Sequence, residues 1–271
     1  IFFPLIMFNF TEIFFYPMKQ AFILWISAAI ITFLIGYFQS RTSSYYPISG
    51  TFGIEGQKVS YHLKKIHNSN EDFKLVIRTD REDLRGAALW RIDNSQAEWQ
   101  IDSMQFVDES LTAVIPKQNP LTKVEYKIII SHNNKEFFIP ATQAVEVLFL
   151  GKVPFTISLH YYLTLFVGLL LSIRTGLESF HNRPRLRLYS IFTGISFFSC
   201  ALIFAPVKKA YEMGIIGKSV PPINDIFEVW LLLLVFLWIA AIVIISYAQR
   251  KKIYALSFSI ISIIIFLSQN L

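Results

Sequence analysis

Runs of apolar residues, each close to the length of a membrane-spanning helix, divide this chain at regular intervals. They occupy residues 20–38, 155–173, 188–205, 229–248 and 253–268. A helix needs about 20 predominantly apolar residues to cross about 30 Å of hydrocarbon. The pattern therefore predicts five transmembrane helices.

The segment 45–152 shows a different pattern, in which apolar and polar residues alternate as they do in β-strands. Val59, Tyr61 and Leu63 fall on one side of a strand. Further short strands are expected at 73–77, 86–92, 98–107, 111–115, 124–130, 136–139 and 143–150. Asn133 and Asn134 predict a hairpin turn, because Asn tolerates positive φ. About seven strands at this spacing favour an all-β sandwich of the immunoglobulin or fibronectin III type, with Trp90 and Trp99 in its core or between its sheets.

Basic residues set an orientation for this architecture. Four arginines follow the second apolar run, at 174, 183, 185 and 187, and Arg250, Lys251 and Lys252 follow the fourth. Loops rich in Lys and Arg stay in the cytoplasm. The amino terminus is then cytoplasmic, whereas the β-domain and the carboxyl terminus are extracytoplasmic.

Four segments follow from these patterns. Residues 1–17 form an amino-terminal extension with no assigned role, and 18–40 form a transmembrane signal-anchor that begins at Met18-Lys19. Residues 45–152 form the β-sandwich. Residues 153–271 form a four-helix transmembrane region. The fold class is a five-span helical membrane protein with an inserted all-β domain.

Composition narrows the classes of function. Hydrophobic residues make up 54% of the chain and charged residues 16%, which is too apolar for an ordinary soluble protein. The formal charge of +6 is explained by basic loops facing an anionic inner leaflet, so nucleic acid is not expected as a partner. A single cysteine, Cys200, lies in the third apolar run, and this excludes a disulfide or a thiolate metal site in the β-domain.

Several segments together are similar to a known group of proteins. They are VSYHL…HNSNEDFKLVI, ALWRI, KVEYKI and GKVP…LHYYLTLFVGLLLSIRTGLE, within residues 45–228. The succession resembles bacterial inner-membrane proteins of uncharacterised function, which have a signal-anchor, an extracytoplasmic fibronectin- or Ig-like domain and a carboxyl-terminal four-helix membrane region. The resemblance implies this topology and a bacterial cytoplasmic membrane. It implies no activity and no catalytic residues.

His160 lies early in the second apolar run and is the weak candidate for a cofactor ligand. Neutral imidazole is a common axial ligand of haem. Bis-histidine ligation needs a second histidine at matching depth, and no other apolar run contains one. Beside Tyr161 and Tyr162, His160 is more simply part of an interfacial aromatic belt.

Arg174 and Glu178 mark the cytoplasmic end of the second run. They are four residues apart and share a helix face. A snorkelling arginine and an interfacial ion pair account for them. Contact with a cytoplasmic partner is the functional alternative.

The connection at 206–228 is longer than a helix–helix loop requires. Its apolar residues Tyr211, Ile215, Ile216 and Ile223 predict that it docks on the β-domain and forms an interaction surface with it. The alternative is that they lie among lipid headgroups. Asn224 or Asp225 is expected as the N-cap of the next helix.

The sequence contains no GxSxG, HExxH or P-loop motif, and no ionisable residue lies near the middle of a span. We therefore expect no catalytic, cofactor or metal residues and no enzymatic activity of the chain by itself. The expected function is a membrane-embedded accessory or scaffold protein of an envelope complex, with the lipid bilayer and a protein as partners. A redox or transport subunit that uses His160 is the alternative, and a Soret band lost on His160→Ala would favour it.

Overall fold

The computed structural model describes residues 3–54, 57–93, 97–133, 135–141, 143–218 and 222–269. The chain divides into two compact units. A helical unit contains residues 1–43, 154–209 and 220–271, and a β unit contains residues 44–153 and 210–219. The β unit therefore includes ten residues from the connection between the third and fourth predicted spans.

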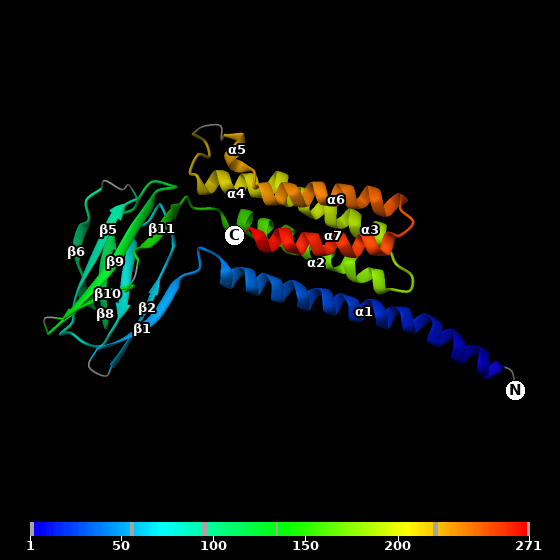
Figure 1. Cartoon of the computed structure of the whole chain (residues 1–271), viewed down its shortest axis with the longest axis horizontal. Coiled ribbons are helices and arrows are strands. Elements are labelled where there is room, and N and C mark those ends of the chain that lie inside the picture. The colour runs from blue at the N-terminus through cyan, green and yellow to red at the C-terminus, as the bar shows by residue number, and fades with distance from the viewer. Residues whose placement is uncertain are drawn as a thin grey trace. The chain divides into compact units, whose positions relative to one another are not determined.

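The helical unit is built from long apolar helices (Figure 1). These are α1 (Phe3–Thr42), α2 (Phe155–Leu177), α3 (Leu186–Ser199), α6 (Val229–Tyr247) and α7 (Lys251–Ser268). Shorter helices are η1 (Glu178–Phe180), η2 (Cys200–Phe204), α4 (Ala205–Glu212) and α5 (Ile223–Ile226). Within the described residues, five stretches are long and apolar enough to cross a membrane: 19–42, 155–180, 186–212, 229–247 and 251–268. The five predicted apolar helices are thus confirmed.

Helices α2, α3, α6 and α7 pack against one another, and α1 packs on α2. Small residues allow the close approach that is typical of membrane helices. A Cβ at Gly168 would lie 2.9 Å from the ring of Phe197, and a Cβ at Gly176 would lie 2.6 Å from Ser259. Trp238 is fully buried, and its indole N–H donates a hydrogen bond to Ser262 Oγ over 2.9 Å.

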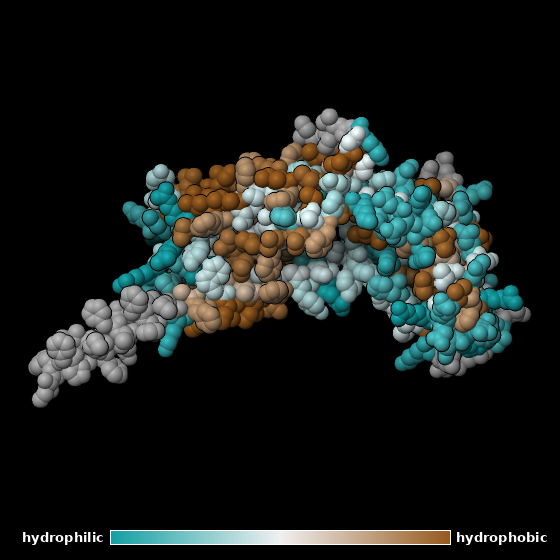
Figure 2. All heavy atoms as spheres, turned by 180° about the vertical axis from the view of Figure 1, so that it is seen from behind, coloured by the Kyte–Doolittle hydropathy of each residue, from teal (hydrophilic) through white to brown (hydrophobic). Residues whose placement is uncertain are grey.

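The outer surface of the helical unit is apolar, as expected for a surface that contacts lipid tails. Figure 2 shows hydrophobic residues covering these helices, whereas hydrophilic residues predominate over the β unit. Phe22, Phe33 and Phe236 are about two-thirds exposed. Such exposure of large apolar side chains marks an interaction or membrane surface.

The third apolar helix extends further than predicted. The sequence indicated a loop from residue 206, but α4 continues to Glu212. Pro206 has no N–H to donate, and the π-helical turn η2 immediately precedes it. Such wide turns accommodate a proline or an inserted residue within a helix. The prediction that the helix ends at Pro206 is therefore wrong.

The predicted N-cap of the fourth span is also wrong. Asn224 and Asp225 lie inside the short helix α5. The N-cap of α6 is Glu228, whose backbone carbonyl accepts hydrogen bonds from the N–H groups of Leu231 and Leu232. Glu228 also receives a hydrogen bond from Tyr161 of α2 (3.3 Å), which ties the start of α6 to α2.

The β unit contains eleven strands among the described residues, in two sheets. They are β1 (Ile48–Ile54), β2 (Gln57–Leu63), β3 (Ile66–Asn68), β4 (Phe73–Arg78), β5 (Arg85–Ile92), β6 (Gln100–Ser103), β7 (Gln105–Val107), β8 (Ser110–Ile115), β9 (Lys123–His132), β10 (Lys135–Ile139) and β11 (Val145–Leu150). One sheet has the order β1-β2-β4-β8-β7. The other has the order β3-β11-β9-β5-β6, with β10 also paired to β9.

The two sheets enclose one hydrophobic core, to which most strands contribute alternate residues. Along β4, Phe73, Leu75 and Ile77 are buried while the residues between them are exposed, as the alternation predicted. Tyr126 of β9 is fully buried, and its hydroxyl donates to the Lys64 carbonyl (2.8 Å). Burial raises the pKa of Tyr126, so this hydroxyl stays protonated. The structure thus contains a β-sandwich-like domain.

Two details of the predicted strands change. The predicted strand 98–107 is two strands, because β6 pairs with β5 in one sheet and β7 pairs with β8 in the other. Met104 lies at the crossing, buried against Gly86. The predicted turn after Ile130 is confirmed: β9 and β10 form a hairpin, and Asn133 has a φ of 47°.

Candidate interaction surfaces

The connection 206–228 was predicted to dock on the β-domain, and its residues 210–218 make backbone contacts with that domain. The N–H of Gly151, at the end of β11, donates to the carbonyl of Glu212 over 2.7 Å. A Cβ at Gly151 would overlap the Tyr211 carbonyl, so the close approach requires glycine here. Gly214 has a φ of +65°, and its Cα faces Pro120, whose Cγ would lie 2.6 Å from an added Cβ. The segment is therefore an integral part of the β unit.

The predicted interaction residues in this segment differ in exposure. Tyr211 and Ile215 are half-buried, whereas Ile216 is 48% exposed. The side chain of Ile223 lies outside the described residues. A hollow of about 750 Å³ adjoins the segment. Its lining is mainly polar and basic and comprises Ser69, Asn70, Lys117, Gln118, Asn119, Pro120, Gly151, Lys152, Tyr211, Gly214, Ile216 and Lys218.

A second surface of the β unit was missed by the sequence analysis. The strand registers place Leu89 opposite Ile101, and Ile129 opposite both Ala87 and Phe138. In β5, β9 and β10 these residues alternate with buried ones, and Ile101 lies directly opposite Leu89, so they share the outer face of the β6-β5-β9-β10 part of the sheet. Ile101 is 68% exposed and Phe138 is 49% exposed. We refer to Leu89, Ile101, Ile129 and Phe138 as the outer-face patch.

Charged residues lie on the same face as the outer-face patch: Arg91 and Glu125 are paired with each other, and Lys127 lies directly opposite Leu89. Arg91 Nε donates to Glu125 Oε2 over 2.7 Å, and the Arg91 guanidinium lies 4.6 Å from the centre of the Trp99 ring. Trp99 is 36% exposed, so its assignment to the core or the inter-sheet space is wrong. It lies just before the edge strand β6, next to an arginine that covers its ring. Trp90 is buried as predicted, and its indole N–H donates to Asp102 (2.7 Å).

Consecutive apolar residues were the sequence signal for this patch. Residues 87–90, 128–130 and 137–139 contain apolar side chains without interruption. Alternation in a strand must then place an apolar side chain on each face of the sheet. In a sandwich only one of these faces lies in the core. The other faces away from the core.

Arg174 and Glu178 form an ion pair, but the prediction that Arg174 snorkels to an interface is wrong. Their exposed fractions are 1% and 2%. The guanidinium of Arg174 lies 4.8 Å from the ring centre of Tyr189 in α3 and 5.4 Å from that of Trp25 in α1. Glu178 Oε1 accepts a hydrogen bond from the Arg185 N–H (2.8 Å). The pair therefore joins α1, α2 and α3 inside the helical unit, and contact with a cytoplasmic partner stays a hypothesis.

His160 is exposed and lies one turn into α2. Its Nδ1 lies 2.7 Å from the carbonyl oxygen of Thr156, and its ring stacks on Phe204 with ring centres 5.4 Å apart. These contacts account for the residue as part of an aromatic surface. Its role as a cofactor ligand stays a hypothesis.

Within the described residues, no group of three or more His, Cys, Asp or Glu side chains is placed to hold a metal ion. Comparisons with protein-family models, with curated proteins and with solved structures find no match to this chain. The candidate sites therefore rest on the chain's own geometry. In the β unit these are the 210–218 segment with its hollow and the outer-face patch.

Proposed function

We propose that the chain is an integral membrane accessory or scaffold protein, and that its β-domain binds a protein partner through the outer-face patch. We further propose an Ig- or fibronectin III-like domain outside the cytoplasm of a bacterium, five spans in the inner membrane and a cytoplasmic amino terminus. The basic loops and the resemblance described above support this orientation and location. The 210–218 segment, with Tyr211, Ile215 and Ile216, is proposed as a second contact surface of the same domain.

The outer-face patch is the observation that carries the proposal. Ile101 and Phe138 are large, apolar and largely exposed on a domain that is otherwise well packed. Full burial of such a side chain contributes about 1.5–3 kcal/mol, so covering the exposed part of each would contribute on the order of 1–2 kcal/mol. The ion-paired Arg91 and Glu125 provide a polar rim. An apolar centre with a polar rim is the usual anatomy of a protein–protein interface.

Site-specific cross-linking in intact cells tests the proposal. A photo-reactive amino acid would replace Phe138 in the full-length protein, and a second strain would carry it at Val114 as the control. Val114 is 44% exposed on β8 of the other sheet. We expect one discrete protein adduct from position 138 and none from position 114. The adduct should disappear when Ile101→Asp is added and persist when Val76→Asp, on the control sheet, is added.

Three outcomes would contradict the proposal. They are equal adducts from both positions, no adduct from position 138, or an adduct that contains a second copy of this chain. The last result would make the patch a self-association surface. Because Ile101 and Val76 are both exposed, neither substitution is expected to unfold the domain.

A further inference from the structure

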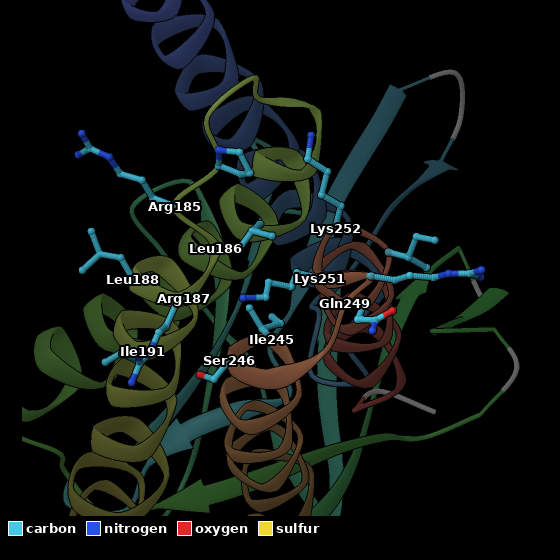
Figure 3. Close-up of a pocket in the computed structure, with 13 residues that line it drawn as sticks. Arg185, Leu186, Arg187, Leu188, Ile191, Ile245, Ser246, Gln249, Lys251 and Lys252 are labelled. Atoms are coloured by element: carbon cyan, nitrogen blue, oxygen red, sulfur yellow. The ribbon is translucent and has the colours of Figure 1, made fainter.

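A basic pocket lies at one end of the helical unit, formed by the start of α3, the end of α6 and the start of α7 (Figure 3). Its volume is about 930 Å³, within the range of small-molecule sites. All its lining residues belong to the helical unit. They are Pro184, Arg185, Leu186, Arg187, Leu188, Ile191, Ile245, Ser246, Gln249, Arg250, Lys251, Lys252 and Ile253.

Every charged residue that lines this pocket is basic, and no carboxylate lines it. The basic residues are Arg185, Arg187, Arg250, Lys251 and Lys252. Among the described residues, the side chains of Arg185, Arg187, Arg250 and Lys251 have no hydrogen-bond or ion-pair partner. Lys252 donates to the His181 carbonyl over 3.2 Å. In Figure 3 the side chain of Lys251 extends toward α3, whereas those of Arg185 and Lys252 extend away from the pocket.

Two helices begin at the pocket, and this adds to the positive potential. Neither α3 nor α7 has an acidic residue in its first turn, and α7 has no side-chain cap. At the start of α3 the N–H of Arg185 is already bonded to Glu178 Oε1, so the free N–H groups of α7 contribute more. The amino end of a helix carries a partial positive charge and free N–H donors. Arg187, Arg250 and Lys251, together with the amino end of α7, therefore favour an anion here.

The pocket also has an apolar wall. Leu188, Ile191 and Ile245 line it beside the cations. Leu188 is 46% exposed, and the exposed residues Phe192 and Ile195 follow it along the lipid-facing part of α3. A small free anion would gain nothing from contact with this apolar wall, whereas the acyl chain of a lipid would pack along it.

We propose that this pocket binds the headgroup of an anionic phospholipid, with the phosphate near Arg187 and Lys251 and an acyl chain along α3. The position fits this ligand, since the pocket lies where three membrane-crossing stretches begin or end. Basic pockets between transmembrane helices are known to accept anionic headgroups. The inference does not depend on the β-domain having a partner.

The test measures lipid binding to the purified full-length protein by native mass spectrometry in a neutral detergent. The probes are dioctanoyl phosphatidylglycerol, dioctanoyl phosphatidylcholine, glycerophosphoglycerol and inorganic phosphate. We expect phosphatidylglycerol to bind more tightly than the other three and to lose affinity as ionic strength rises. The neutral lipid tests the need for the charge, and the two chain-free anions test the need for the apolar wall.

Paired variants test the location. Arg187→Gln with Lys251→Gln removes two charges that line the pocket, and both residues are exposed, so the fold should be retained. Lys19→Gln with Arg183→Gln removes two basic residues that do not line it. At roughly 1 kcal/mol for each cation, the pocket variant should bind phosphatidylglycerol about 30-fold more weakly. The control variant should bind it as the wild type does.

Equal losses in the two variants would mean diffuse electrostatic attraction and would overturn the proposal. Equal binding of phosphatidylglycerol and phosphatidylcholine would do the same. If inorganic phosphate bound as tightly as phosphatidylglycerol, the site would be one for a free anion and not for a lipid.

Discussion

At the scale of single residues, two opposite charges are buried where three helices of the helical unit meet. Arg174 and Glu178 pair across one helical turn, and aromatic rings from α1 and α3 lie against the guanidinium. Taking two ions out of water is costly, and their attraction offsets this cost only when both remain charged and in contact. Removing one partner therefore has a large effect.

We predict that Glu178→Gln destabilises the helical unit by about 3–5 kcal/mol, because it leaves the Arg174 charge buried without its counter-ion. The amide still accepts the Arg185 N–H bond, so the change isolates the charge. Adding Arg174→Met should recover a large part of the loss. Unfolding of the purified protein in detergent measures both effects.

Glu146→Gln is the matched control for this charge removal. Glu146 pairs with Lys123 over 3.0 Å, but both side chains are nearly half exposed. The hydrogen bond to Glu146 raises the pKa of Lys123. An exposed pair contributes less than about 1 kcal/mol, so this variant should unfold almost as the wild type does. Equal effects of Glu178→Gln and Glu146→Gln would show that the buried pair has no special role.

The spacing of Arg174 and Glu178 was sufficient to predict their pairing, because residues four apart meet on any helix. Their burial was not predictable. It depends on Trp25 and Tyr189, which come from helices distant in sequence. Local patterns report which residues share a face, and tertiary packing decides whether that face is covered.

At the scale of elements, the sequence pattern again predicted local structure but not tertiary packing. Alternation predicted strands such as β4 and β9, and apolar length predicted the five helices. The sequence did not reveal the break between strands at Met104, because β6 and β7 have similar alternation of apolar and polar residues although they belong to different sheets. The outer-face patch was hidden for a related reason, since strand pairing determines which apolar residues become neighbours.

The 210–218 segment provides a prediction at this scale. Gly151→Ala should displace the segment from the β unit, because the added Cβ would overlap the Tyr211 carbonyl. Losing the Gly151–Glu212 hydrogen bond and its neighbouring contacts costs about 1–3 kcal/mol. Trypsin cleavage after Lys209 and Lys218 should then become roughly ten- to a hundredfold faster, if it proceeds through the opened segment.

Gly36→Ala provides the matched control, because a Cβ at Gly36 would meet no atom within 4 Å. It should leave the cleavage pattern unchanged. If Gly151→Ala and the wild type were cleaved at the same rate, the segment would not depend on the close approach at Gly151. The proposed second contact surface would then lose its structural basis.

At the scale of the whole molecule, the chain crosses between the helical unit and the β unit near residues 43, 153, 209 and 219. The crossings near 43 and 153 adjoin α1 and α2, the one near 209 lies in the last turn of α4, and the one near 219 precedes α5 and α6. Because the β unit is one compact body, we predict that the helix ends next to these crossings lie on its side of a membrane. These ends are the carboxyl end of α1, the amino end of α2 and the carboxyl end of α4.

The basic loops then predict which side this is. Arg183 and Arg185 precede α3 and Arg187 lies in its first turn. Arg250 precedes α7, and Lys251 and Lys252 lie in its first turn. These helix ends are remote from the crossings. Such loops are retained in the cytoplasm. We predict that the β-domain is extracytoplasmic. Reporter fusions measure this after Lys152, Arg187, Asp225, Lys252 and Leu271.

The fusions after Lys152, Asp225 and Leu271 should be active with a reporter that works outside the cytoplasm, and those after Arg187 and Lys252 with one that works inside. An outside signal at Arg187 or an inside signal at Lys152 would contradict the arrangement.

The charge argument itself is tested by replacing Arg183, Arg185 and Arg187 with glutamine. If the basic residues determine orientation, the Arg187 fusion of this variant should give a mixed signal, because the loop then loses most of its positive bias. Removal of Lys58, Lys64 and Lys65 from the β-domain should leave every fusion unchanged, since charges in a long translocated domain have little influence on orientation.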